Sequence, residues 1–441
     1  MKNFIHFDFK GALPDTAGFC KLLEYFKKCS FDGVVLEYDD RIPWETWPGT
    51  WRKGYSLNEL KQILTHAAKL QLEVIPLIQI QGHLEWLLKH DAYRHLREMP
   101  EVGSEICPQH EEIETTWKKW IDEAAELHPG CRYIHLGGDE TWYAGLCPKC
   151  SAVGKMQVYI EHASRMCHYA LSKNLRPMLW ADMFWRENCM DLAAQLPEGT
   201  VLIDWQYDGI PPFNSTLKLL KTKHQIMGST GITTGYWEHC MRLAGNFQER
   251  FNNISGWKLW AEQNDISLIH TIWARGASLW GMYGLYFSAI PGMIAAGSLE
   301  RWEKHPWKNF MDNLSPVMRN NAFAELEQAA KDILHLPVAD DMEKSAQQWL
   351  HLVLRYQALT SELAIHRSTK IMLDEVQKFV GKDESMLSKH TIRPFIELRK
   401  KATLWEEDAR KFWKQEKLSD EKEFMATHIQ LIKNEINQLL S

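Results

Sequence analysis

Between residues 1 and 300, short apolar runs alternate with longer segments in which apolar residues recur every three or four positions. Nearly continuous apolar runs are typical of strands buried on both faces, as in a parallel sheet covered by helices. Among the intervening segments, Phe19, Leu22, Leu23 and Phe26 form a helical stripe, and Ser56 is a suitable N-cap for the helix that follows it. The predicted strands cover residues 3–9, 33–39, 73–79, 132–138, 176–182, 200–206, 224–230 and 267–273.

Eight strand–helix units predict an α/β fold, a (β/α)₈ TIM barrel over residues 1–300, since doubly wound sheets seldom contain so many strands. After Gly297 the strand pattern stops, and only helical periodicity continues. Residues 310–441 are therefore predicted to form a C-terminal α-helical region that packs on the barrel or on a partner, such as a second copy in a homodimer. Its apolar stripes are Leu352, Tyr356, Leu359 and Leu363, and Ile429, Ile432, Ile436 and Leu439.

The composition of the chain argues against several classes of function. The chain has 441 residues, of which 45% are hydrophobic, so it can bury a large core. A net charge of -6 argues against a nucleic-acid partner. No apolar run is long enough to cross a membrane, and the first residues lack the apolar segment of a signal peptide. The 9 cysteines have no disulfide-framework spacing, which is typical of reduced thiols in a cytoplasmic protein.

In a TIM barrel the active site forms at the carboxyl ends of the strands, so the polar and aromatic residues there are the candidates. Carboxylates, one histidine and three tryptophans describe a sugar site better than a phosphate site, because aromatic faces stack on sugars and carboxylates bind hydroxyls. No glycine-rich nucleotide motif follows a strand, so no nucleotide cofactor is expected. The candidates are Asp8, Lys10, Glu37, Asp39, Asp40, Gln79, His83, Asp139, Glu140, Trp180, Asp182, Trp205, Tyr207, Trp273 and Arg275.

The segment RYIHLGGDETW sets two acids side by side after an apolar run. Neighbouring side chains in a strand point to opposite faces, so Asp139 and Glu140 share a pocket only if the strand has ended. Gly137 and Gly138 permit such a turn. Repulsion and burial would then raise the pKa of one carboxyl, which could act as a general acid. Alternatively, the two acids cap the start of a helix, where negative charge is favoured.

The HLGGDE segment resembles the His-x-Gly-Gly-Asp-Glu signature of the family-20 glycoside hydrolases, the β-N-acetylhexosaminidases. The resemblance extends from Asn3 to about Gly297 and is greatest to the hexosaminidase D branch, which starts almost directly at the barrel. It implies a barrel fold and a substrate that is a glycan or glycoconjugate bearing a terminal N-acetylhexosaminide. The segments that carry it are HFDFKGALP, VVLEYDDRIPWE, EVIPLIQIQGHLEWLLKH, ELHPGCRYIHLGGDE and PMLWADM.

The resemblance also implies a mechanism. In this family the 2-acetamido carbonyl of the substrate attacks C1 and forms an oxazolinium intermediate, with retention of configuration and without a metal or cofactor. By resemblance, Glu140 protonates the leaving oxygen and then activates water, while Asp139 orients the acetamido N–H and stabilises the cation. His83 matches a histidine that relays to the acid through Asp39 or Asp40.

The remaining resemblances concern the sugar pocket. Trp180, Trp205 and Trp273 match the tryptophans that wall the acetamido group. Tyr207 matches the tyrosine that hydrogen-bonds its oxygen, although Tyr236 is an alternative. Two positions depart from the usual pattern: Lys10 stands near the place of an arginine after the first strand, and Arg275 replaces a glutamate after the last tryptophan. The hexosaminidase D branch shares both departures and favours galactosaminides, which implies that preference here.

The sequence leaves two other functions open. A sugar-binding barrel without catalysis has no use for a general acid, yet both acids are present. A metal-dependent amidohydrolase barrel would want a His-x-His motif after the first strand, where this chain has HFD. Cys147 and Cys150 have the spacing of half a zinc site, but no second pair is evident nearby, and we expect them to be structural.

Overall fold

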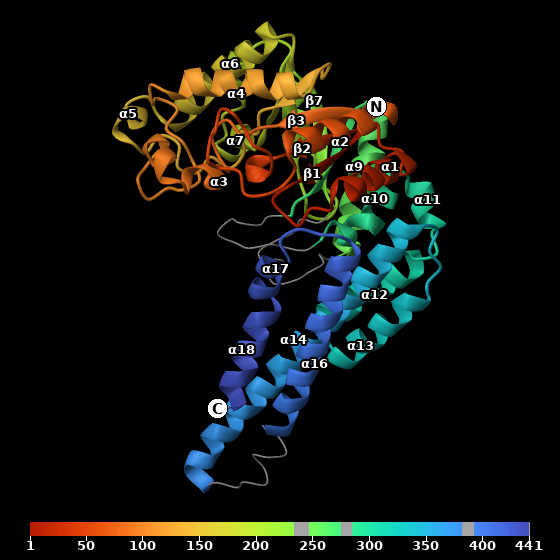
Figure 1. Ribbon diagram of the computed structural model, residues 1–441. Coiled ribbons are helices and arrows are strands. Elements are labelled where there is room, and N and C mark those ends of the chain that lie inside the picture. The colour runs from red at the N-terminus through yellow and green to blue at the C-terminus, as the bar shows by residue number, and fades with distance from the viewer. Residues whose placement is uncertain (233–246, 275–284, 382–391, 441) are drawn as a thin grey trace.

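The computed structural model describes residues 1–232, 247–274, 285–381 and 392–440. Eight parallel strands form a closed barrel in chain order, and β8 pairs with β1 from Asn3↔Leu268 to Phe7↔Ile272 (Figure 1). The predicted TIM barrel followed by a helical region is confirmed. The strands are β1 (Asn3–Asp8), β2 (Gly33–Glu37), β3 (Glu73–Leu77), β4 (Tyr133–His135), β5 (Arg176–Trp180), β6 (Val201–Trp205), β7 (Gln225–Gly231) and β8 (Ser267–Ile272).

The strands are buried on both faces, which is why their sequences are nearly continuous in apolar residues. Alternate side chains point into the barrel and form an inner core that includes Phe4, Val35, Ile75 and Met178. The other set packs under the surrounding helices; Ile5, Val34 and Leu36, for example, belong to the outer core. The interior of the barrel is therefore filled with side chains, and the carboxyl ends of the strands all lie at one mouth.

Helices cover the outside of the barrel. In α1, Phe19, Leu22, Leu23 and Phe26 are fully buried, as their spacing predicts. Ser56 caps α2 through a capping box with Glu59, in which each residue bonds the other's backbone N–H. The helices of this part are α1 (Thr16–Lys28), α2 (Leu57–Lys69), α3 (Glu85–Leu88), α4 (Ile113–Leu127), α5 (Pro148–Ser151), α6 (Lys155–Ser172), α7 (Asp182–Arg186), α8 (Asn214–Leu219), α9 (Phe247–Asn264), α10 (Ile290–Gly297) and α11 (Leu299–Glu303).

The C-terminal helices form a bundle, of which α14, α16 and α18 extend away from the barrel (Figure 1). The predicted stripe on α14 is buried, and Ile429, Ile432 and Ile436 are the buried residues of α18. Pairing of two chains through this region stays a prediction. The helices are α12 (Lys308–Asn320), α13 (Phe323–Asp332), α14 (Asp341–Val380), α16 (Arg393–Gln415), α17 (Glu421–Thr427) and α18 (Ile429–Leu440).

The turn between α16 and α17 anchors the bundle beside the mouth of the barrel. Ser419 exchanges two hydrogen bonds with Leu13, one from its backbone N–H at 2.8 Å and one to its Oγ at 2.9 Å. Asp420 forms an ion pair with Arg41, which is fully buried and also donates to Phe9 O and Gly11 O. The bundle therefore supports the segments that follow β1 and β2.

Two features of the described residues relate to membrane crossing and to the cysteines. Over the described residues, every helix is too short or too polar to traverse a lipid bilayer. The eight described cysteines are all free of disulfide bonds.

Candidate active site

The two adjacent acids lie beyond the end of the short strand β4. Gly137 and Gly138 have φ angles of 62° and 85°, in the left-handed region that favours glycine, and Glu140 itself has a φ of 49°. A Cβ atom at Gly137 would lie 1.8 Å from Oε1 of Gln79, so any other residue there would displace this buried side chain. The next helix, α5, begins only at Pro148, so the acids do not cap a helix. The chain turns here, as the two glycines predict.

This turn brings both carboxylates to one histidine. His83 Nε2 lies 3.2 Å from Asp139 Oδ2 and 3.7 Å from Glu140 Oε2. His83 has a φ of 54°, and a Cβ at the preceding Gly82 would lie 2.8 Å from the carbonyl oxygen of Asp139, so the loops after β3 and β4 are in close contact. Three residues predicted for the site are therefore neighbours.

The two carboxylates differ in environment. The side chain of Asp139 is 7% exposed, whereas that of Glu140 is 30% exposed. Burial by itself raises the pKa of Asp139, but the adjacent His83 lowers it, and the resulting pKa lies below the usual value. Among the described residues, no donor reaches the buried Oδ1 of Asp139. Asp139 is therefore an ionised acceptor with an open position, and Glu140 is the more solvent-exposed of the two acids.

Asp182 and Arg186 complete the surroundings of Glu140, and neither was predicted to act with it. Asp182 Oδ2 accepts a hydrogen bond from the backbone N–H of Glu140 at 3.1 Å. Arg186, one helical turn later, places Nε 3.3 Å from Asp182 Oδ2 and a terminal nitrogen 3.7 Å from Glu140 Oε1. Burial, with the charge of Asp139, raises the pKa of Asp182 to about 7. The structure therefore raises the pKa of a third acid, Asp182, whereas the pKa of Asp139, a member of the adjacent pair for which the sequence predicted a raised value, is lowered.

The sequence carries a weak signal for these two residues. Asp182 ends the predicted strand 176–182, and Arg186 follows it at i+4, the spacing of residues that meet on one helix face. Asp182 is already a predicted site residue, and its spacing to Arg186 is the signal that could have identified the arginine.

The predicted aromatic residues form one wall of the mouth. Trp180 and Trp273 have ring centroids 6.2 Å apart, and both belong to the inner core of the barrel. Trp205 stacks on Tyr207 with centroids 5.0 Å apart and an interplanar angle of 26°. Nε1 of Trp273 donates to the hydroxyl of Tyr207 at 3.3 Å, which links the two pairs. The guanidinium of Arg186 lies 5.0 Å from the Trp205 ring. Tyr236, the alternative to Tyr207, lies outside the described residues.

Lys10 lies in a buried ionic cluster at the ends of β1 and β2. Its Nζ is 2.7 Å from Glu37 Oε1, 3.1 Å from Asp8 Oδ1 and 3.3 Å from Asp39 Oδ2. These three carboxylates can use all three protons of the ammonium group. Burial raises the pKa of Asp39 well above its usual value, whereas Lys10 holds that of Glu37 well below, against the effect of burial. Lys10 therefore balances the acids, and its contact with a sugar stays a prediction.

The remaining predictions concern Asp40, the relay from His83, and Arg275. Asp40 pairs with Lys89 at 3.1 Å and with Arg52 at 3.3 Å, while Asp39 faces Lys10. His83 lies beside Asp139 and Glu140, and its relay through Asp39 or Asp40 stays a prediction. Arg275 lies outside the described residues.

The sequence also matches a protein-family model. The catalytic domain of glycosyl hydrolase family 20 matches residues 36–277, which run from β2 to just beyond β8. The chain is 39% identical to hexosaminidase D of Bos taurus over 145 residues, 32% of this chain and 42% of that protein. It is 32% identical to hexosaminidase D of Homo sapiens over 216 residues, 46% of this chain and 44% of that protein. The matches thus span less than half the length of either relative.

Solved structures share the fold at low identity. An exo-β-N-acetylglucosaminidase from Vibrio harveyi, solved with N-acetylglucosamine, superposes with a TM-score of 0.52 at 12% identity, covering 71% of this chain and 58% of that one. A catalytic module of a pneumococcal exo-β-D-N-acetylglucosaminidase gives 0.50 at 13% identity, covering 81% and 97%. These likenesses concern the fold alone. The family model, however, covers more than half of the chain and includes the acids, the histidine and the tryptophans described above, so the chain belongs to glycosyl hydrolase family 20.

Proposed function

We propose that the chain is an exo-acting β-N-acetylhexosaminidase that releases terminal β-linked GalNAc or GlcNAc by a retaining, substrate-assisted mechanism. The observation that carries this proposal is the pair of adjacent carboxylates in one pocket, in which Asp139 is buried and ionised and Glu140 is partly exposed. A retaining enzyme with its own nucleophile needs two carboxyl groups about 5 Å apart across the sugar. Adjacent acids at the end of one strand suit a substrate that supplies its own nucleophile.

In the proposed reaction Glu140 gives its proton to the glycosidic oxygen as the acetamido oxygen attacks C1. Asp139 Oδ1, which no described donor reaches, accepts the acetamido N–H and stabilises the positive charge that develops on the ring. Water then opens the oxazolinium with Glu140 as the base. The wall of Trp180, Trp205 and Trp273 excludes water from the acetamido group and holds it near C1.

Two alternatives are less well supported. A binding protein without catalysis would have no need of an ionised acid beside a reachable one. A metal-dependent amidohydrolase needs a group of metal ligands at the mouth of the barrel. Of the described residues, two groups have donors close enough to hold a metal ion, and neither contains Asp139, Glu140 or His83.

The mechanism predicts hydrolysis of aryl N-acetyl-β-hexosaminides with net retention. Proton NMR of the first-formed sugar should show the β anomer before it mutarotates. The matched aryl glycoside with a hydroxyl in place of the acetamido group lacks the nucleophile and should react at least about 10²-fold more slowly. An α-configured first product, or equal rates for the two glycosides, would contradict the acetamido mechanism.

We also propose that galactosaminides are cleaved at least as well as glucosaminides. The two sugars differ only in the orientation of O4, so the side chains around O4 decide the preference. Arg275 stands where the family usually has a glutamate, and arginine can only donate hydrogen bonds. One charged hydrogen bond is worth about 1.5–3 kcal/mol, enough for a preference of roughly tenfold or more. The test compares kcat/KM for paired aryl substrates in the wild type and in Arg275→Glu. A strong glucosaminide preference, or an unchanged ratio in the variant, would refute the proposal.

A further inference from the structure

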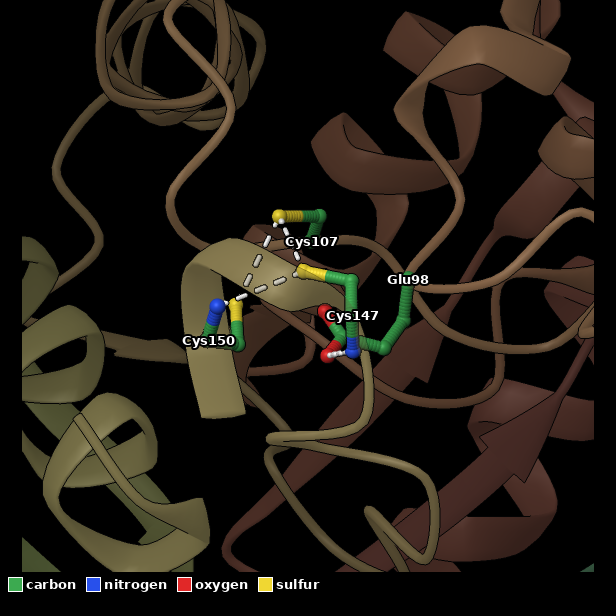
Figure 2. Close-up of side chains that lie close together, drawn as sticks. All are labelled: Glu98, Cys107, Cys147 and Cys150. Carbon is green, nitrogen blue, oxygen red and sulfur yellow. Dashed lines mark hydrogen bonds between the residues drawn. The ribbon is translucent and has the colours of Figure 1, made fainter. Parts of the chain in front are cut away.

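Three cysteines and a glutamate meet outside the candidate active site. The sulfur of Cys107 lies 3.5 Å from those of Cys147 and Cys150, and one carboxylate oxygen of Glu98 lies with all three sulfurs inside a 4.8 Å span (Figure 2). All four side chains are buried. Cys147 and Cys150 have the spacing noted in the sequence, whereas Glu98 and Cys107 come from a distant loop. The structure thus brings two more candidate ligands to a pair that is incomplete in the local sequence.

The backbone holds these side chains in place. Cys147 is the N-cap of α5, Pro148 opens the helix, and the N–H of Cys150 donates to Cys147 Sγ at 3.4 Å. This helical turn places the sulfurs of Cys147 and Cys150 on the same side. Glu98 and Cys107 directly follow the two residues of the antiparallel bridge Arg97↔Ile106, and the backbone N–H of Cys107 donates to Leu96 O at 2.8 Å. The donors therefore sit on two braced segments.

Only one of the two carboxylate oxygens of Glu98 has a hydrogen-bond donor among the described residues. Its Oε1 accepts the backbone N–H of Cys147 at 2.9 Å. Its Oε2 is buried, and among the described residues no donor bonds it. Figure 2 shows this second oxygen on the side of the carboxylate that faces the sulfurs. A buried carboxylate oxygen without a partner is costly, and a cation held between it and the three sulfurs would remove that cost.

We propose that Glu98, Cys107, Cys147 and Cys150 form a structural zinc site. A tetrahedral site with Zn–S bonds of about 2.3 Å has sulfurs roughly 3.8 Å apart, close to the observed separations of 3.5 Å. A disulfide would need about 2.05 Å and would leave the third thiol unused. Thiolates with one carboxylate suit zinc better than magnesium or calcium. Four protein ligands fill the coordination sphere, so the ion has no open position for catalysis.

The metal would join the loop after β3 to the loop after β4. The first carries His83 and ends near Cys107, and the second carries Asp139 and Glu140 and leads to Cys147. Glu105 already bridges these loops, because its two carboxylate oxygens lie 3.0 and 3.1 Å from the backbone N–H of Tyr143. The proposed ion gives the pocket a second brace. Its binding releases the protons of the three thiols to solvent.

The test measures metal in the full-length chain, expressed with added ZnCl₂ and purified without a metal-affinity tag. Elemental analysis should find about one zinc per chain. Cys107→Ser and Cys150→Ser should lose essentially all of it. Glu98→Gln should weaken zinc affinity by at least the roughly 10–100-fold seen when an outer-shell partner is removed. Cys167→Ala is the matched control, because Cys167 is a buried free thiol within α6, and it should keep its zinc.

A second measurement applies if a cysteine variant does not fold. Wild-type chain stripped with a strong chelator should unfold at a lower temperature and recover when ZnCl₂ is restored. Replacement by cobalt should give sulfur-to-metal charge-transfer absorption and the intense visible bands of a tetrahedral site. Wild-type chain that binds no zinc, a folded Cys107→Ser variant that keeps a full equivalent, or a disulfide found by mass under non-reducing conditions would each overturn the proposal.

Discussion

Glu140→Gln is expected to lower kcat/KM by about 10²–10⁴-fold for glycosides with poor leaving groups and far less for activated aryl glycosides. Glutamine keeps the shape of the side chain but has no acidic proton to transfer to the glycosidic oxygen. Activated leaving groups depart without protonation, so they do not need the acid. The side chain that changes is the partly exposed one, 3.7 Å from both His83 and Arg186. The measurement is kcat/KM across a series of aryl N-acetylhexosaminides of graded leaving-group pKa.

The control is Glu105→Gln. Glu105 is a buried acid of the same pair of loops, yet it bonds the backbone of Tyr143 and not the reacting groups. Its replacement should leave the dependence on leaving group as it is in the wild type. Equal losses across the series for Glu140→Gln would show that another group is the acid. Asp182, with a pKa of about 7, would then be the next candidate.

The fold follows from the chain's local patterns. Each predicted strand is a short apolar run, and each becomes a barrel strand because such a run cannot be left exposed on either face. The boundaries are less well predicted. The run at 132–138 continues past His135, but β4 stops there, because the positive φ angles of Gly137 and Gly138 take the chain out of the sheet. Apolar character therefore marks where a strand lies better than where it ends.

The site was predictable as far as it depends on strand ends. A parallel barrel brings all these ends to one mouth, so His83, the two acids and the tryptophans could be grouped before their contacts were known. Individual contacts were not predictable. The strand-end positions place Asp8, Glu37 and Asp39 at the mouth, but only the folded chain shows that all three carboxylates surround Lys10. Likewise, Cys107 is 40 residues from Cys147, and no local pattern pairs them.

Asp139→Asn is expected to lower kcat/KM by about 10²–10³-fold for every substrate of the same aryl series, which is the range measured when one stabilising hydrogen-bond partner is removed from a transition state. Orientation of the acetamido group and stabilisation of the ring cation are needed whatever group leaves. Asparagine keeps the volume and can still accept a hydrogen bond, but it lacks the charge. The loss should therefore be uniform, and the slope of rate against leaving-group pKa should match the wild type.

The pH dependence of this loss gives a second test. Because His83 holds the pKa of Asp139 below its usual range, the carboxylate is ionised at every pH above that value. The ratio of wild-type to Asp139→Asn activity should accordingly stay constant between about pH 5 and 8, where an ordinary aspartate is also ionised. It should fall only at more acidic pH, as the wild-type carboxylate gains its proton and loses its advantage. A ratio that instead rises steeply through neutral pH would mean that Asp139 is protonated in the resting enzyme. In that case it could not accept the acetamido N–H as an anion, and its role would belong to another acid of the pocket.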